Sequence, residues 1–244
     1  WHYVPRARQG LSRGEMTAAQ LKSAEALIAS GLSSRGYKQT RAIIDLELIL
    51  REVEGRRGVI RFDRNPDLYY FRVFGSPGGA EPWGWSVEGH HVSLNFTVVN
   101  GEIISPTPSF FGANPSEVKS GPHKGLRILK DEEELARGLL LSLEPDQRRS
   151  AVIYPTAPAD LITRASRRVE IEKPAGLAAK LMSGDQRESL MALVKVYVER
   201  KTPDVVARAL RKIEAAGVSN IHFAWAGSEF RGQGHYYRIH GPSL

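Results

Sequence analysis

The sequence predicts an α+β fold, in which helices cover an antiparallel sheet built from residues 58–111 and 220–240. One observation is an alternating segment, Val92 to Val98, which is followed by Asn100-Gly101. Asn-Gly between alternating runs is a strong signal for a β-hairpin. A second observation is the order along the chain, which is helical, strand-rich, helical and again strand-rich. That order is typical of a single α+β domain whose last hairpin completes the central sheet.

The first part of the chain predicts an extended basic arm over residues 1–15 and then two helices. Thr17 and Gln20 have the spacing of a capping box, which opens a helix. Apolar residues keep helical spacing from there to Gly31. A second helix is predicted over residues 33–54, with an apolar stripe that ends before Gly55.

The next block predicts an antiparallel meander over residues 58–111. Val59–Phe62 and Leu68–Phe74 are rich in β-branched and aromatic residues and are bounded by turn signals, as strands are. Three further strands complete the meander. They lie around Trp83–Trp85, from His90-His91 along the alternating segment, and after the Asn-Gly turn.

Residues 112–218 predict a helical insertion between the two halves of the sheet. Acidic residues at 131–134 suit the first turn of a helix, and Pro145 suits the start of a short one. Ser183 and Gln186 form a second capping box, and Pro203 opens a helix that stops near Gly217. The chain then returns to strands on either side of a glycine-rich loop, at Ile221–Trp225 and His235–Ile239.

Composition excludes several classes of protein. The 244 residues are 41% hydrophobic and 25% charged, which is ordinary for a globular protein. The absence of Cys excludes disulfides, thiolate metal sites and a cysteine nucleophile. No apolar run approaches the ~20 residues that span a bilayer. We therefore expect a soluble protein, either cytoplasmic or exported after processing, since the chain begins at Trp1 rather than Met.

The formal net charge of +7 is spread along the chain. The densest basic clusters are Arg51/Arg56/Arg57/Arg61/Arg64 and Arg164/Arg167/Arg168. Neither cluster has interleaved aromatic residues or a known reader motif, so a nucleic-acid partner is disfavoured. The expected partner is a small-molecule ligand or substrate, and the oligomeric state stays open.

One face of the alternating strand carries His91, Ser93, Asn95 and Thr97, because side chains in a strand alternate between faces. A hydrolase or lyase site on this face would use His91 as general base, Asn95 as an orienting or oxyanion group, and Glu88 as an acid. A divalent metal could take His90, His91 and His235 as ligands. In a regular strand His90 and His91 would point to opposite faces, so both could reach one metal only at a bulge. The alternative is that these groups hydrogen-bond loops and turns.

A second hypothesis is a non-catalytic module that binds a sugar or aromatic ligand. Its groove would be lined by Trp83, Trp85, Tyr236 and Tyr237, and the alternative is that these rings pack in the core. Ser109 reads as a turn residue rather than a nucleophile, because no base is fixed near it in the sequence. The Gly227–Gly234 loop lacks the Lys-Ser or Lys-Thr of a phosphate loop, and no G-x-S-x-G elbow occurs.

Several long segments together resemble one known family. They are WHYVPR, WGWSVEGHHVSLNFTVV, PSFFGANPSEV, GPHKGLR, IHFAWAG and HYYRIHGP. They are similar to the bacterial family called Domain of Unknown Function 3500, and the similarity runs nearly from end to end. The resemblance implies a shared fold and no established activity. It also implies that the segment like HYYRIHGPSL continues into a strand and a His-x-His, so a chain ending at Leu244 would carry part of any site that needs those residues.

Overall fold

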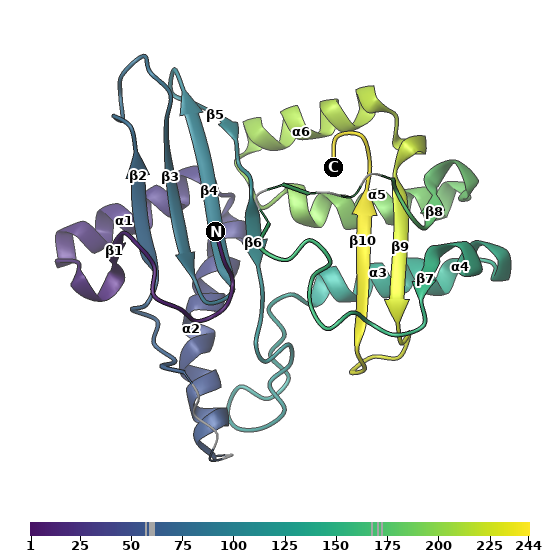
Figure 1. Cartoon of the computed structure of the whole chain (residues 1–244), viewed down its shortest axis with the longest axis horizontal. Helices are drawn as coiled ribbons and strands as arrows, with labels where there is room; N and C mark the ends of the chain where they lie inside the picture. Colours follow the sequence, from purple (N-terminus) through teal and green to yellow (C-terminus); the bar gives the residue numbers. More distant parts are fainter. Residues whose placement is uncertain (57, 59–61, 167, 170, 172) are drawn as a thin grey trace. The chain divides into compact units, whose positions relative to one another are not determined.

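The chain forms two compact units, each with its own sheet and its own hydrophobic core. The computed structural model describes residues 1–56, 58, 62–166, 168–169, 171 and 173–244. Unit 1 consists of Trp1–Leu129 and Glu199–Val205, and unit 2 consists of Lys130–Val198 and Val206–Leu244. The α+β class with antiparallel sheet is confirmed. The expected joining of the two strand blocks is wrong, since they form separate sheets (Figure 1).

Unit 1 begins with an irregular arm, the short strand β1 (Leu11–Ser12) and a 3₁₀ turn (Arg13–Glu15). Two helices follow, α1 (Ala18–Gly31) and α2 (Ser34–Arg56). The predicted capping box at α1 is confirmed. Thr17 Oγ1 accepts a hydrogen bond from the Gln20 backbone N–H at 3.3 Å, and Gln20 Oε1 accepts one from the Thr17 backbone N–H at 2.9 Å. A local sequence signal therefore fixes the start of α1.

The unit 1 sheet has the order β1-β2-β3-β4-β5, and β6 also pairs with β4. Its further strands are β2 (Tyr70–Phe74), β3 (Trp83–Gly89), β4 (Val92–Val99), β5 (Glu102–Ser105) and β6 (Ser109–Phe111), all paired antiparallel. Asn100 and Gly101 form the β4–β5 turn with φ of 50° and 79°, the left-handed values that this hairpin turn requires. Residues 59–61 of the strand predicted at Val59–Phe62 lie outside the described residues.

The two faces of this sheet differ in chemistry. One face packs against α1 and α2, behind the strands in Figure 1, and forms the core of unit 1. From β4 it contributes the apolar set predicted from alternation, which is Val92, Leu94, Phe96 and Val98. The opposite face carries polar side chains, and the N-terminal arm reaches it, because Tyr3 stacks on Phe110 at 4.8 Å and Phe110 is paired with Ser93. The predicted alternation is confirmed for β4.

Unit 2 has a mixed sheet of order β10-β9-β7, with β8 also on β9. Its strands are β7 (Val152–Tyr154), β8 (Leu177–Ala178), β9 (His222–Gly227) and β10 (His235–His240), and β7 runs parallel to β9. Its helices are α3 (Lys130–Ser142), α4 (Pro145–Ala151), α5 (Gly184–Val198) and most of α6 (Pro203–Ala216). Phe223 and Trp225 on β9 lie in its core with apolar residues from α3 and α5.

The predicted helical insertion over residues 112–218 is helical only in part. Within the described residues, 112–129 and 155–176 contain no helix, and the short strands β7 and β8 were not predicted. Two or three residues are too few to produce a periodic pattern. No helix among the described residues is long and apolar enough to cross a membrane.

Candidate functional site

The His90–His91 pair forms the turn between β3 and β4. The last residue pair of this hairpin is Gly89 with Val92, so only the two histidines remain between the strands. His91 has φ of 61°, in the left-handed region. The two rings stack, with centroids 3.9 Å apart and an interplanar angle of 27°. The two side chains would point to opposite faces only in a regular strand, and these residues form a turn instead.

His90 is oriented by a buried carboxylate from α2. Its Nδ1 hydrogen-bonds Glu47 Oε1, and the two side chains are 10% and 6% exposed. A carboxylate oxygen accepts, so Nδ1 is the donor in this bond and Nε2 is the ring nitrogen that this bond does not engage. Tyr69 donates its hydroxyl to the His90 carbonyl at 2.6 Å. Burial raises the pKa of Tyr69 well above its ordinary value, which keeps this hydroxyl available as a donor.

The Glu47–His90 pair lies on the wall of a pocket of about 280 Å³. The other lining residues are Pro5, Arg6, Ala7, Arg8, Phe62, Asp63, Asn65, Leu68, Tyr69 and Tyr70. The arm forms one side of this pocket and is tied to the sheet, since Arg8 Nη2 donates to the Gly89 carbonyl at 3.0 Å. A carboxylate–imidazole pair is thus held where a small molecule could reach it.

His91 has a different environment from His90. Burial lowers the pKa of His91 to about 3, with further contributions from the charges of His90 and Arg64. A group with so low a pKa is neutral at physiological pH and is a weak base. His91 can therefore support the ring of His90 by stacking, whereas the geometry favours His90 for proton transfer.

Glu88 lies on the polar face of β3 among cations. It forms an ion pair with Arg72 of β2, and Arg72 Nε also donates to Ser86 Oγ at 3.0 Å. Arg8 Nε is 3.8 Å from Glu88 Oε2. Glu88 is only 4% exposed, so it anchors both the arm and β2 to β3. This arrangement gives Glu88 a clear structural task.

Asn95 lies on the same face of the sheet as Glu88, because Glu88 is paired with Ser93, two residues before Asn95. Its Nδ2 donates to Ser93 Oγ at 3.1 Å and to the Pro108 carbonyl at 2.9 Å. Asn95 thus fixes the residue that immediately precedes Ser109. The catalytic roles predicted for Glu88, His91 and Asn95 stay predictions.

His235, the remaining predicted metal ligand, belongs to unit 2. Its ring stacks on Trp225 with centroids 5.1 Å apart, and its Nδ1 is 3.0 Å from the Gln233 carbonyl oxygen. Among the residues that the structure describes, no group of three or more His, Asp or Glu side chains could hold a metal ion. The metal hypothesis for His90, His91 and His235 stays a prediction.

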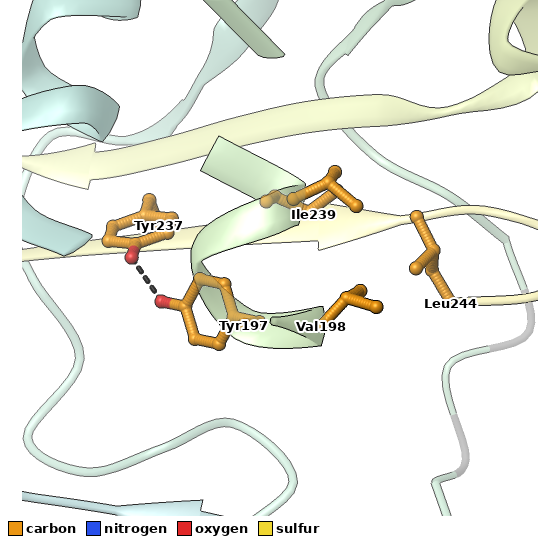
Figure 2. Close-up of a pocket in the computed structure, with 6 residues that line it drawn as sticks. Tyr197, Val198, Tyr237, Ile239 and Leu244 are labelled. Atoms are coloured by element: carbon orange, nitrogen blue, oxygen red, sulfur yellow. Dashed lines mark hydrogen bonds between the residues drawn. The ribbon is translucent and has the colours of Figure 1, made fainter. Parts of the chain in front are cut away.

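The four aromatic residues predicted to form one groove occur in both units. In unit 1, Trp85 is buried and stacks on Phe96 at 4.2 Å, and Trp83 is half-buried. In unit 2, Tyr236 and Tyr237 are neighbours on β10 and point to opposite faces. Figure 2 shows Tyr237 beside a pocket of about 310 Å³, with its hydroxyl hydrogen-bonded to the hydroxyl of Tyr197. Core packing accounts for Trp85, whereas Tyr237 lines a cavity.

The basic clusters are partly neutralised. Arg64 forms two hydrogen bonds with the carboxylate of Glu54, at 2.8 and 2.9 Å, and Arg56 pairs with Glu52. Arg57, Arg61 and Arg167 lie outside the described residues. These pairs fit the solvated or structural interpretation of the first cluster.

Two functional candidates were missed in the sequence. Glu47 lies on the buried stripe of α2 that includes Ile43, Ile44 and Leu50, and a carboxylate in an apolar stripe is a usable signal. Lys201 gave no such signal, because its partner is 92 residues away: Lys201 Nζ donates to Ser109 Oγ at 2.6 Å. The structure therefore places an amine against Ser109, a contact that the sequence did not indicate.

A comparison with family models identifies the chain. The model described as "Protein of unknown function (DUF3500)" matches residues 1–244, which is the whole sequence. The comparisons with curated proteins and with solved structures gave no match. The segments noted in the sequence, including the one that contains His90, His91 and Asn95, fall within the matched range. The chain belongs to the DUF3500 family of proteins of unknown function.

Proposed function

We propose that unit 1 is a His-dependent hydrolase or lyase in which His90 is the general base and Glu47 orients it. The observation that carries this proposal is the hydrogen bond between Glu47 and His90 Nδ1 on the wall of a pocket. A carboxylate on Nδ1 selects the tautomer with a free Nε2 and stabilises the imidazolium that forms on proton uptake. Acid–base catalysis by a positioned group of this kind contributes ~10²–10⁴-fold to a rate.

The same geometry serves either reaction class. In a hydrolase, Nε2 would take a proton from water as the water attacks the substrate. In a lyase, Nε2 would take a proton from a substrate carbon as the neighbouring bond breaks. When His90 gains the proton, the buried pair becomes an ion pair, which is favourable at short range. His91 supports the base by stacking on its ring while remaining neutral.

The pocket lining favours a small polar substrate. Its volume of about 280 Å³ is at the lower limit of ligand pockets, which run from ~300 to ~1,000 Å³. Arg6 and Arg8 supply guanidinium groups and Tyr70 supplies a phenol, while Phe62 and Leu68 supply apolar surface. Hydroxyl or carboxyl groups on the substrate would find donors here.

A substrate screen with matched variants tests the proposal. The purified protein is assayed on ester, lactone, glycoside and hydroxy-acid substrates, and then as Glu47→Gln and His90→Gln. We expect each variant to lose at least 100-fold in turnover. His123→Asn, in an exposed loop, is the control that should retain wild-type activity. Turnover by His90→Gln at the wild-type rate would contradict the proposal.

The same proteins can distinguish a metal-dependent mechanism from one that uses the Glu47–His90 pair alone. Metal content is measured on protein purified without chelator, for the wild type and for His235→Asn. A near-stoichiometric metal that is lost in His235→Asn would favour the set His90, His91 and His235. Activity without bound metal would favour the Glu47–His90 pair acting alone.

A second candidate function is binding of a small apolar ligand by unit 2. The pocket beside Tyr237 is lined by Val194, Tyr197, Val198, Tyr237, Ile239 and Leu244 (Figure 2). Its polar side-chain groups, the hydroxyls of Tyr197 and Tyr237, are bonded to each other. A thermal-shift screen with aromatic and sugar ligands tests this function, with Val194→Trp as the variant that fills the pocket. A ligand that raises the melting temperature of both proteins equally would not bind there.

A further inference from the structure

Unit 1 contains a second reactive arrangement, outside the pocket of His90. We propose that Ser109 and Lys201 form a serine–lysine dyad whose serine is acylated by carboxylic esters. The two residues are the exposed first residue of β6 and a buried lysine from the Glu199–Val205 segment of the same unit. This proposal is independent of the function proposed for His90.

The geometry is that of a nucleophile and its base. Lys201 Nζ and Ser109 Oγ are 2.6 Å apart, within the range expected for an activated nucleophile. The residue Lys201 is only 6% exposed, and its Nζ lies 5.3 Å from the ring centroid of Phe96 and 5.6 Å from that of Phe111. The amine is thus shielded from water, while Ser109, the residue that it contacts, is exposed.

The protonation state of Lys201 suits this task. Burial, with a smaller contribution from the neighbouring charge of Arg200, lowers the pKa of Lys201 to about 7. A substantial fraction of Lys201 is therefore a neutral amine at neutral pH and can accept a proton. An ordinary surface lysine would be almost entirely protonated there.

Both residues are held in place from outside the pair. Ser109 lies opposite Leu94 in the β4–β6 pairing, and Asn95 donates to the carbonyl of the preceding Pro108 at 2.9 Å. Lys201 forms a β-bridge with Leu32, and the carbonyl of Arg200 accepts from the Ser33 N–H at 2.9 Å. Asn95 is therefore a positioning residue for the nucleophile, a task that the polar pattern of β4 did not suggest.

The face of the sheet that carries the dyad also holds a pocket of about 260 Å³. Its apolar lining comes from Trp83, Trp85, Val98 and Ile103. Its polar lining comes from Ser30, Glu102, Asp204 and Thr202, and Thr202 follows Lys201. Thr202 Oγ1 is buried without a hydrogen-bond partner among the described residues. The lining is part apolar and part acidic, and the pocket has room for a small acyl group.

The acylation step balances as follows. Ser109 Oγ forms a bond to the ester carbonyl carbon, and its proton passes to Lys201 Nζ. The bond from that carbon to the alkoxy oxygen then breaks, and Lys201 returns the proton to the departing alcohol. Hydrolysis of the acyl-serine by water repeats the sequence, releases the carboxylic acid and restores the Ser109 hydroxyl.

Labelling with a fluorophosphonate probe tests the dyad on the full chain. We expect the probe to modify Ser109, located by peptide mass spectrometry, with a rate that rises through a midpoint near pH 7. Ser109→Ala should remove the label, and Lys201→Met should slow labelling at least 100-fold. Ser105→Ala, at the last residue of β5, should label like the wild type.

The variant Lys201→Arg distinguishes two roles of Lys201, that of a base and that of a structural cation. Arginine keeps the positive charge over the phenylalanine rings but cannot give up its proton near pH 7. Labelling of Lys201→Arg at the wild-type rate would overturn the proposal, as would label on any residue other than Ser109 or no label on the folded wild type. Far-UV circular dichroism and melting temperature confirm that each variant is folded. If Lys201→Met does not fold, Lys201→Arg and Ser109→Ala decide the result.

Discussion

The two units differ in what they bury. Unit 1 buries charged and titratable side chains beside its sheet, namely Glu47, Arg64, Glu88, His90, Arg200 and Lys201. Unit 2 surrounds Trp225 with leucine, valine, alanine and isoleucine, and its buried polar side chains are Glu132, Arg137 and Gln186. Burying a charge costs stability unless it is well paired. In unit 1 the carboxylates Glu47 and Glu88 are paired with His90 and Arg72, so the cost falls mainly on Lys201, whose hydrogen-bond partner Ser109 is a neutral hydroxyl. The core of unit 2 is mostly apolar.

We expect the largest effect on stability when one buried tryptophan is removed from each unit in turn. Trp85 stacks on Phe96 in unit 1, and Trp225 stacks on His235 and Tyr237 in unit 2. Each Trp→Ala change should lower the free energy of unfolding of its own unit by ~3–5 kcal/mol. Hydrogen exchange measured by mass spectrometry should locate the faster exchange in that unit. If Trp225→Ala accelerated exchange equally in both units, they would unfold together, as the sequence prediction of a single domain requires.

The buried lysine predicts the next largest effect. The pKa of Lys201 is about 7 in the folded protein against 10.5 for an ordinary lysine, so the unfolded chain binds more protons between these values. The free energy of unfolding should therefore rise with pH, by roughly 3 kcal/mol from pH 7 to pH 10 from this group. Urea denaturation of the wild type and Lys201→Met across this range measures the difference. If the free energy of unfolding changed with pH equally in the wild type and in Lys201→Met, Lys201 would be protonated in the folded state.

Local sequence signals predicted much of this fold. The capping boxes at Thr17 and Ser183, the proline at the start of α4 and the Asn100-Gly101 turn are each complete within a few residues, and each is confirmed. The separation into two sheets was not predictable in this way. Strand β9 pairs with β7 and β8, and strands of two or three residues carry no period that would reveal a partner.

In the candidate sites too, features set by local spacing were predictable from the sequence, whereas contacts between distant residues were not. The shared face of Ser93, Asn95 and Thr97 followed from alternation, because their spacing along β4 is local. The partners of His90 and Ser109 could not be predicted from local spacing. Glu47 is 43 residues from His90, and Lys201 is 92 residues from Ser109. Which polar group meets which histidine or serine is decided by tertiary packing. The stacked turn of His90 and His91 was missed because a strand was assumed at both positions.

A smaller pH effect is expected from His91 in unit 1. Its pKa is about 3 in the folded protein against 6.5 for an ordinary histidine, so the unfolded chain takes up a proton first as pH falls. The free energy of unfolding should decrease by about 2 kcal/mol between pH 7 and pH 5 from this group. His91→Asn is the matched variant, because asparagine tolerates the left-handed φ of 61° and does not titrate. The wild type should show a steeper loss than His91→Asn, and equal slopes would contradict the low pKa.

The smallest effect compares one helix-start motif in the two units. Gln20 and Gln186 both accept from the backbone N–H of their capping residue, Thr17 or Ser183, at 2.9 Å. Gln20 is exposed, whereas Gln186 is buried and its Nε2 also donates to the Ser142 carbonyl at 2.8 Å. Gln186→Ala leaves that carbonyl without this donor, so we expect a loss of ~1–3 kcal/mol in the free energy of unfolding, against less than ~1 kcal/mol for Gln20→Ala. Chemical denaturation of the two variants measures both values. Equal losses would mean that the buried glutamine of unit 2 acts only as a cap, and that its core depends on apolar packing alone.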